Sequence, residues 1–486
     1  MKKNLLPLVL VCACFHLHGA TAPWKMIYSN DTTNILVCDS PYHRRGDNTF
    51  DEEKIRMSVR EAAVKGMGAQ LLQPGTSWVP WWRSTLVPLK EHEQWFRAHF
   101  GIEPSVPMHR FLLEGGDLID TFAAECLNYN IDAIVSFRAN DSHLQEYAFA
   151  PLTPSPGMAG CISRFYVEHP EYRRGSLSAI EWKDRNHNWA IPEARAYKEA
   201  LLWELIENYP KLAGVEIDFM RHPFYFPDSL PLSRRVSIMT DFIKKARAAL
   251  DEVAKKTNGK HRYLGVRVPM SATEWKDVGL EPKAWENAGV DYFNLSPSYC
   301  TTQQTDIAKV RAAVSRAAIY AELTHTAMTW RMGGEGYDDH NYRRMTKEAL
   351  ESTARLFYAR GADGVSLFNF VYYRAHGGYR EYKGPFDEPP FAALEKLAQR
   401  KQLEQDAPAY FFLWARDVPF ERKTTRSFEM DMLPKGTARG VLRILVLTQN
   451  ELPMGETEQP EKIDRGKWTV KLNGSTLTAK GAASVA

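Results

Sequence analysis

Two carboxylates lie two residues apart in the segment GVEIDFMRHPFYF, residues 214–226. The segment reads as a buried β-strand, in which alternate side chains share a face, so Glu216 and Asp218 point the same way. Burying an unpaired acid is costly, so we expect these acids at the exposed C-terminal end of the strand. Arg221, His222 and an aromatic run follow directly. The pattern predicts a strand that delivers acids into a cleft of carbohydrate size.

The elements that must position these acids alternate regularly. Short apolar strands are expected at residues 33–41, 68–75, 131–141, 212–222, 262–270, 290–299, 317–325 and 362–373. Helical periodicity lies between them, for example over residues 193–210 and 232–256. Eight strand-then-helix units predict a (β/α)8 TIM barrel. A doubly wound sheet is the alternative, but eight regular repeats favour closure.

In such a barrel the site lies at the C-terminal ends of the strands. Asp218 and Glu322 end the fourth and seventh strands, on opposite sides of the barrel mouth. Hydrolysis of a glycosidic bond needs two carboxylates that flank it, so these two are the predicted catalytic pair. The candidates for binding sugar or orienting the acids are Asp39, Arg138, Asn140, Glu216, Arg221, His222, Arg267 and Asn294. Each of them can also be read as a satisfied buried polar group or a cap.

Aromatic side chains and arginines suggest how a glycan would be held. Trp81, Trp82, Trp189 and Trp330 are the candidate platforms for sugar rings, although most tryptophans are core residues. Arginines at strand ends favour an acidic glycan, because guanidinium binds sulfate or carboxylate groups in a bidentate way. Pairing of the same arginines with internal acids such as Glu216 is an equal alternative.

At these residues the chain resembles a family. The fourth strand, together with CDSP, VSFRAND, YFNLSPSY and VSLFNF at other strand ends, is similar to the bacterial family-10-like glycosyl hydrolases. The resemblance covers residues 33–405 loosely and implies an exported glycosidase-type barrel with a C-terminal β-module. The strand-4 and strand-7 acids also resemble those of the large retaining clan. That clan has Asn-Glu at strand 4, where this chain has Ile217-Asp218, so the role of each acid stays open.

Composition limits the other possibilities. Residues 1–22 read as a signal peptide, which predicts export to the periplasm or the medium, with lipoprotein anchoring the lesser alternative. The formal net charge is +3, so no basic field invites nucleic acid. No later segment is apolar and long enough for a membrane helix. Four cysteines outside residues 1–22 lack CxxC spacing and are read as free buried thiols.

The expected organisation is a barrel over residues 23–405 and a small β-module over 406–486, where apolar residues alternate with period two. The module has too few strands for a complete sandwich. No cofactor is expected, and the histidines considered, His222, His325, His340 and His376, show no metal-ligand spacing.

Two rival functions remain open from the sequence. One is a non-catalytic carbohydrate-binding barrel, in which Asp218 and Glu322 would not need to face each other. The other is a metal-dependent hydrolase that uses Asp39, His222 and Asp218.

Overall fold

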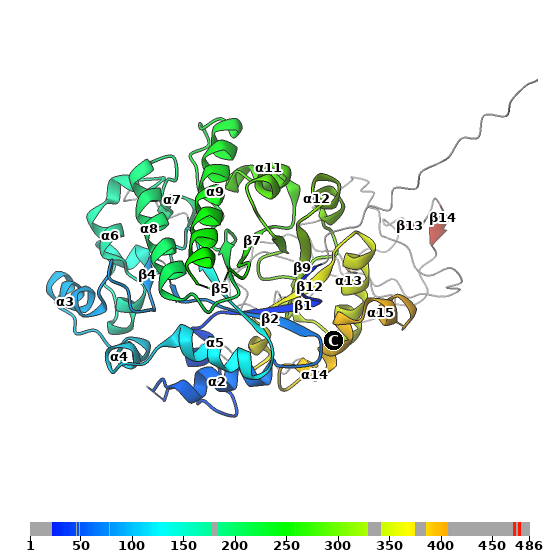
Figure 1. Ribbon diagram of the computed structural model, residues 1–486, viewed down its shortest axis with the longest axis horizontal. Helices are drawn as coiled ribbons and strands as arrows, with labels where there is room; N and C mark the ends of the chain where they lie inside the picture. The colour runs from blue at the N-terminus through cyan, green and yellow to red at the C-terminus, as the bar shows by residue number, and fades with distance from the viewer. Residues whose placement is uncertain are drawn as a thin grey trace, which may run out of the picture. The chain divides into compact units, whose positions relative to one another are not determined.

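The computed structural model describes residues 22–406 except 45, 48, 77, 177–181, 258, 329–341 and 375–384, together with residues 412, 470–472 and 475–477. Eight parallel strands close into a barrel, with helices around it (Figure 1). The predicted TIM barrel is therefore confirmed. In the described part of the chain, no helix combines the length and hydropathy needed to cross a membrane.

The barrel strands follow the order β1-β12-β9-β8-β7-β6-β5-β2 and then return to β1. Their bounds are β1 (Met26–Asn30), β2 (Met67–Leu72), β5 (Asp132–Arg138), β6 (Gly214–Asp218), β7 (Tyr263–Pro269), β8 (Tyr292–Ser296), β9 (Ala318–Thr324) and β12 (Gly364–Phe368). Two short hairpins, β3 (Gly75–Thr76) with β4 (Val79–Pro80) and β10 (Thr326–Met328) with β11 (Tyr342–Arg344), lie outside the barrel. Seven of the eight expected strands thus lie where the sequence predicted them.

The first expected strand is wrong. Residues 33–41 contain a short helix, α1 (Asn34–Val37), while β1 comes earlier and pairs with both β2 and β12. A short apolar run such as Ile35–Val37 has no periodicity that separates a strand from a helical turn. As a consequence Asp39 does not end a strand, and Asp31 stands directly after β1 instead.

Helices lie between the strands along the chain, some packed against the barrel and others within its long loops. They include α2 (Glu52–Glu61), α3 (Leu89–Phe100), α4 (Pro107–Leu113), α5 (Leu118–Asn128), α6 (Arg164–Glu168), α7 (Trp182–Arg185), α8 (Pro192–Asn208), α9 (Leu232–Lys256), α10 (Trp275–Val278), α11 (Pro282–Asn287), α12 (Ile307–Ala313), α13 (Lys347–Ala359), α14 (Phe391–Leu394) and α15 (Arg400–Asp406). Side-chain caps fix several starts, for example Asp117, which accepts from the amides of Ile119 and Asp120. The large core lies between these helices and the strands.

A second apolar cluster fills the N-terminal half of the barrel interior. Trp24 closes this end, where its amide and carbonyl bond to the hydroxyl of Tyr320 at 3.0 and 2.9 Å. The Tyr292 ring fits beside β7 only because residue 265 is glycine, since a Cβ there would lie 1.9 Å from the ring. Polar side chains therefore occupy the C-terminal half of the barrel interior.

The C-terminal residues form a separate unit, Asp431–Ala486, in which the structure describes one antiparallel pair, β13 (Val470–Leu472) with β14 (Ser475–Leu477). The other strands expected after residue 406 and the expected signal peptide at residues 1–22 lie outside the described residues, save for residues 22 and 412. The larger β-module therefore stays a prediction.

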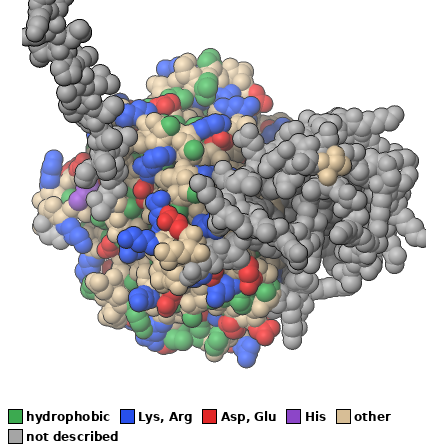
Figure 2. Space-filling model, turned by 90° about the vertical axis from the view of Figure 1, so that its right-hand side faces the viewer, with side chains coloured by type: hydrophobic (Ala, Val, Ile, Leu, Met, Phe, Trp, Pro, Cys, Tyr) green, Lys and Arg blue, Asp and Glu red, His purple; other side chains and the backbone are tan. Residues whose placement is uncertain are grey.

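The surface carries charges of both signs. On the face drawn in Figure 2, Lys and Arg side chains are interspersed with Asp and Glu, as the small net charge predicts. The four cysteines of the described region, Cys38, Cys126, Cys161 and Cys300, are free thiols, and all but the half-buried Cys161 are buried. This agrees with the expectation from their spacing.

Candidate active site

One arginine joins the two predicted catalytic acids. The Arg267 guanidinium binds Glu322 in a bidentate way, with Nε to Oε2 at 2.6 Å and Nη2 to Oε1 at 2.8 Å. Its Nη1 donates to both oxygens of Asp218, at 3.2 and 3.1 Å. All three side chains are buried. The acids of β6 and β9 therefore meet at one guanidinium, inside the C-terminal half of the barrel.

The register of the strands explains this meeting. Asp218 on β6 pairs with Arg138 on β5 on one side and Arg267 on β7 on the other, so three charges share one level. The Arg267 guanidinium lies 4.0 Å from the ring centroid of Phe368 at the end of β12, which fixes its plane. Ser296 on β8 completes the set, accepting from Arg267 at 2.9 Å and donating to Glu322 at 2.6 Å.

Glu216 lies one inward-facing position deeper than Asp218 and is bound by neutral groups. Ser136 donates to its Oε1 at 2.8 Å and Asn294 to its Oε2 at 3.0 Å. Burial, with the nearby Asp218 charge, raises the pKa of Glu216 to about 8. The ion pair between Glu216 and an arginine, an alternative that the sequence left open, is not formed, because Arg267 binds Asp218 and Glu322 instead. Burial of Glu216 thus favours its protonated form.

The pKa of Glu322 is also raised. Burial is the larger cause, and it exceeds the opposing effect of the Arg267 charge and its hydrogen bonds. Burial lowers the pKa of Arg267, but the Glu322 and Asp218 charges outweigh it, so the guanidinium stays charged. Glu322 is therefore suited to hold a proton, while the Arg267 charge also faces Asp218.

Arg138 is the centre of a second charged group. Its Nη2 lies 2.8 Å from Oδ1 of Asp31 and its Nη1 2.9 Å from Oδ2 of Asp141. Burial raises the pKa of Asp31, but the charges of Arg138, Arg221 and Arg267 together with the Asn369 hydrogen bond outweigh it and hold that pKa low. Sequence reasoning missed Asp31, and its signal was an acid directly after the alternating run MIYSN. Arg138 is thus an internal partner of acids.

Arg221 and two histidines line the rim beside Asp141. Arg221 donates from Nε to His143 Nδ1 at 3.1 Å and from Nη1 to the hydroxyl of Tyr299. His222 has a left-handed backbone, with φ of 55°, and its Nδ1 accepts from the Ser142 amide at 3.0 Å. Burial, then the Arg221 charge, lowers the pKa of His143 to about 4 and that of His222 well below its usual value. Both rings are neutral at neutral pH.

Asn140 and Asn294 hold the surrounding structure. Asn140 donates to the carbonyls of His187 and Phe224, both at 3.1 Å, and so joins two long loops at the rim. Asn294 binds Glu216 inside the barrel. Both asparagines are fully buried, so they orient the site rather than face a ligand. Asp39 is half-buried and follows α1 rather than a barrel strand.

The tryptophan platforms are wrong for three of the four residues. Trp81, Trp82 and Trp189 are 3%, 4% and 0% exposed and belong to the core. The Trp81 indole donates to the Gly160 carbonyl at 3.1 Å and the Trp82 indole to Glu204 at 3.0 Å. Trp82 is thereby tied to α8, a contact that sequence patterns do not reveal. Trp330 lies outside the described residues.

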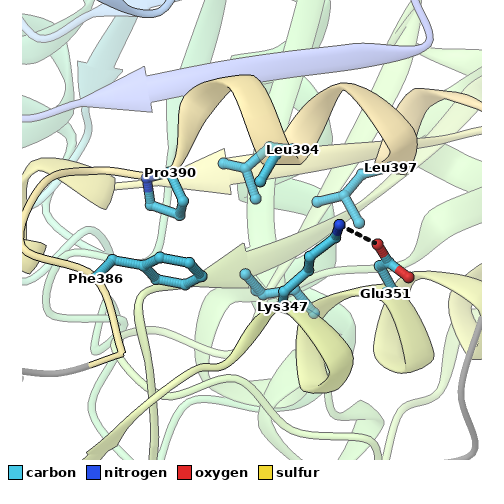
Figure 3. Close-up of a pocket in the computed structure, with 8 residues that line it drawn as sticks. Lys347, Glu351, Phe386, Pro390, Leu394 and Leu397 are labelled. Atoms are coloured by element: carbon cyan, nitrogen blue, oxygen red, sulfur yellow. Dashed lines mark ion pairs between the residues drawn. The ribbon is translucent and has the colours of Figure 1, made fainter.

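One hollow in the structure lies beside Arg138, and another lies in the outer layer of helices. One is lined by Trp78, Phe137, Arg138 and Lys198 among others, so it borders the charged group of Arg138. Lys198 lies 4.6 Å from the Phe137 ring centroid, and burial lowers its pKa to about 7. The other hollow lies in the outer layer between α13 and residues 386–397, where Lys347 faces Glu351 at 3.9 Å (Figure 3). Its walls are mostly apolar, and the acid among them, Glu351, pairs with Lys347 and Lys396.

Comparisons with known proteins identify similar solved structures but no family. No protein-family model matches the chain, and no curated protein matches its sequence. Similar structures include a GH138 enzyme targeting pectin rhamnogalacturonan II, at a TM-score of 0.43 and 13% identity over 78% of this chain and 39% of that one. A chitinase from Bacteroides thetaiotaomicron has a TM-score of 0.38 and 11% identity over 78% and 97% of the two chains. The PgaB (BpsB) glycoside hydrolase domain from Bordetella bronchiseptica has 0.40 and 13% over 77% and 99%.

These structural neighbours are glycoside hydrolases, and the chain spans about two fifths of the length of the GH138 enzyme. The family-10-like resemblance gains no family match and stays an expectation. With identities of 11–13% and low TM-scores, the function has to be inferred from the site's own geometry.

Proposed function

We propose that the chain is an exported glycoside hydrolase in which Asp218 and Glu322 are the catalytic pair. The observation that carries the proposal is that Arg267 binds both acids at once, at the C-terminal ends of β6 and β9. A glycosidase needs two carboxylates close together with different affinities for a proton. Two acids on one guanidinium meet the first demand.

The raised pKa of Glu322 meets the second demand, different affinities of the two acids for a proton. Glu322, whose pKa is raised, is suited to donate a proton to the leaving oxygen, and Asp218, fixed by Arg267 and the Met220 amide at 2.8 Å, is suited to be the nucleophile. Because both acids reach one guanidinium, we propose the retaining reaction, for which carboxyl groups lie about 5–5.5 Å apart rather than about 6.5–9.5 Å.

The proposed substrate is an oligo- or polysaccharide, and Arg221 is the arginine that would meet an acidic group on it. Arg138 and Arg267 bind internal acids, whereas Arg221 donates to a histidine and a tyrosine at the half-buried rim. His222, beside it, would contact the same sugar. Arg138, Asn140, Glu216, Arg267 and Asn294 then orient the acids rather than bind sugar.

A second function has an observation in its favour. Asp218, Glu322 and Arg267 are so deeply buried that they could form a purely structural ion network inside a non-catalytic carbohydrate-binding barrel. Binding without turnover would separate this alternative from the hydrolase.

The test is a panel of neutral, uronic-acid and sulfated glycans incubated with the full chain. Release of reducing ends, with the anomeric form of the first product read by proton NMR, supports the hydrolase and reports retention or inversion. Affinity for one glycan without any product supports the binding barrel and refutes the hydrolase.

A further inference from the structure

We propose that Asp141, His143 and His222 form a binding site for one divalent transition-metal ion, of which Zn²⁺ is the best probe. Three atoms that can coordinate a metal lie within 4.8 Å of one another there. Two imidazole nitrogens and one carboxylate oxygen suit zinc and similar ions. The site does not depend on the proposed glycosidase, and it differs from the metal set Asp39, His222 and Asp218 considered from the sequence.

The carboxylate of Asp141 divides its two oxygens between two tasks. Its Oδ2 accepts from Arg138 at 2.9 Å, while its Oδ1 lies 2.5 Å from Nδ1 of His143 and 3.6 Å from Nδ1 of His222. One oxygen is thus anchored by a guanidinium, and the other accepts from the His143 amide at 2.9 Å and faces both imidazoles. Because Nδ1 of His222 accepts from the Ser142 amide, His222 would bind a metal after releasing that hydrogen bond or through Nε2. Around bound metals, a ligating carboxylate is typically hydrogen-bonded by a second residue, as Asp141 is here by Arg138.

The imidazole of His143 is in conflict without a cation. Its Nδ1 accepts from Arg221 Nε, which requires a lone pair at this nitrogen, yet the same atom lies 2.5 Å from a carboxylate oxygen. A proton on Nδ1 would satisfy Asp141 but would face the Arg221 N–H. A metal ion bound by Nδ1 and Oδ1 would satisfy both lone pairs once Arg221 turns away and the two atoms move apart, because bonds of about 2.0–2.2 Å at tetrahedral angles need more than the present 2.5 Å separation.

The backbone presents the histidines from two different loops. His143 and Ser142 follow β5, and His222 follows β6 in a left-handed conformation that non-glycine residues seldom adopt. Asn186 fixes this conformation, donating to the His222 carbonyl at 2.7 Å and accepting from the Ser142 hydroxyl at 2.8 Å. Strain held by neighbouring bonds in this way is found at functional sites.

The site is open enough for exchange with solvent. The side chains of His143 and His222 are 20% and 10% exposed, and Asp141 is fully buried. A metal with three protein ligands would take water in its remaining position. Arg221 is the competitor, since its guanidinium donates to the nitrogen that the metal would take.

The test uses tag-free full chain, dialysed against a chelator and titrated with ZnCl2 by calorimetry, with bound zinc counted by elemental analysis. One equivalent is expected for the wild type, and His143→Ala and His222→Ala should each weaken binding at least tenfold. Arg221→Gln should tighten it severalfold. His261→Ala is the matched control, an exposed histidine paired with Asp291, and should bind as the wild type does.

Circular dichroism of each variant shows whether it folds. The tighter zinc binding expected for Arg221→Gln is a second check, because a folding defect would weaken binding. Zinc bound equally by the wild type and both histidine variants would place the ion elsewhere and overturn the proposal. So would a wild type that binds no zinc, whatever Arg221→Gln does.

Discussion

Replacement of Arg267 by methionine should destabilise the protein strongly. The guanidinium makes five hydrogen bonds, two to Glu322, two to Asp218 and one to Ser296. Methionine fills much of the same volume but leaves two buried carboxylates without their cation. Removing one partner of a buried ion pair costs about 3–5 kcal/mol, so we expect a loss of that size in the free energy of unfolding.

The pH dependence of this loss has a definite sign. Without Arg267, the pKa of Glu322, which burial already raises, loses the charge that opposes the rise and moves further above the unfolded value of about 4. An acid whose folded pKa is raised loses stability as pH rises, because only the unfolded state releases the proton. The deficit of Arg267→Met should therefore be small near pH 4–5 and large near pH 8.

Urea denaturation followed by circular dichroism at pH 5 and pH 8 measures both effects. Arg56→Met is the control, since Arg56 is 28% exposed, pairs with Glu52 and Glu125, and should cost about 1 kcal/mol or less. A loss below about 1 kcal/mol for Arg267→Met at pH 8 would refute the idea that this arginine stabilises the buried acids Asp218 and Glu322. Equal losses of stability at pH 5 and pH 8 would refute the predicted pH dependence.

Three further predictions concern Glu216, Arg221 and Trp81. Glu216→Gln should fold normally. A buried acid with a pKa of about 8 lowers the free energy of unfolding by up to about 1.4 kcal/mol per pH unit between about pH 4.3 and 8, and the variant should lose this dependence. An unchanged slope of stability against pH in urea melts would contradict the prediction. Arg221→Ala should raise KM for an acidic glycan far more than for a neutral one and remove the salt dependence of turnover, and equal changes on both substrates would speak against an acidic substrate. Trp81→Phe should leave KM unchanged but lower stability by about 1 kcal/mol, since the indole bond to Gly160 is lost; a selective rise in KM would restore Trp81 as a sugar platform.

The barrel could be predicted because its signals are local. Seven strands are short apolar runs, and helices with clear periodicity separate them. β1 was missed because MIYSN lies close to the expected cleavage site, while the nearby run Ile35–Val37 is more apolar but helical. That error moved the strand-end acid from Asp31 to Asp39.

The contacts of the site were less predictable, because they depend on which side chains meet across the barrel. Strand-end position indicated Asp218, Glu322 and Arg267, but not that Arg267 would bind these two acids and leave Glu216 to Ser136 and Asn294. That choice follows from the register of neighbouring strands, which sequence does not specify. His143 was passed over because it is separated from His222 by a whole repeat.

The burial of the tryptophans depends on how the long loops fold. Trp81 and Trp82 lie in a loop rich in aromatic and proline residues, which predicts a binding surface and a core equally well. Contacts with Gly160 and Glu204, far away in the chain, decide for the core.

Turnover by Asp218→Asn and Glu322→Gln, measured on the first glycan that the wild type hydrolyses, tests the central claim most directly. Asp132→Asn is the matched control, because this carboxylate begins β5 at the opposite end of the barrel and accepts from Trp24 at 2.8 Å. We predict that the control keeps wild-type turnover, while each site variant folds and loses far more than tenfold, a cost well above about 1.4 kcal/mol in transition-state stabilisation. Turnover within tenfold of wild type in either folded site variant would contradict the assignment of Asp218 and Glu322 as the catalytic pair.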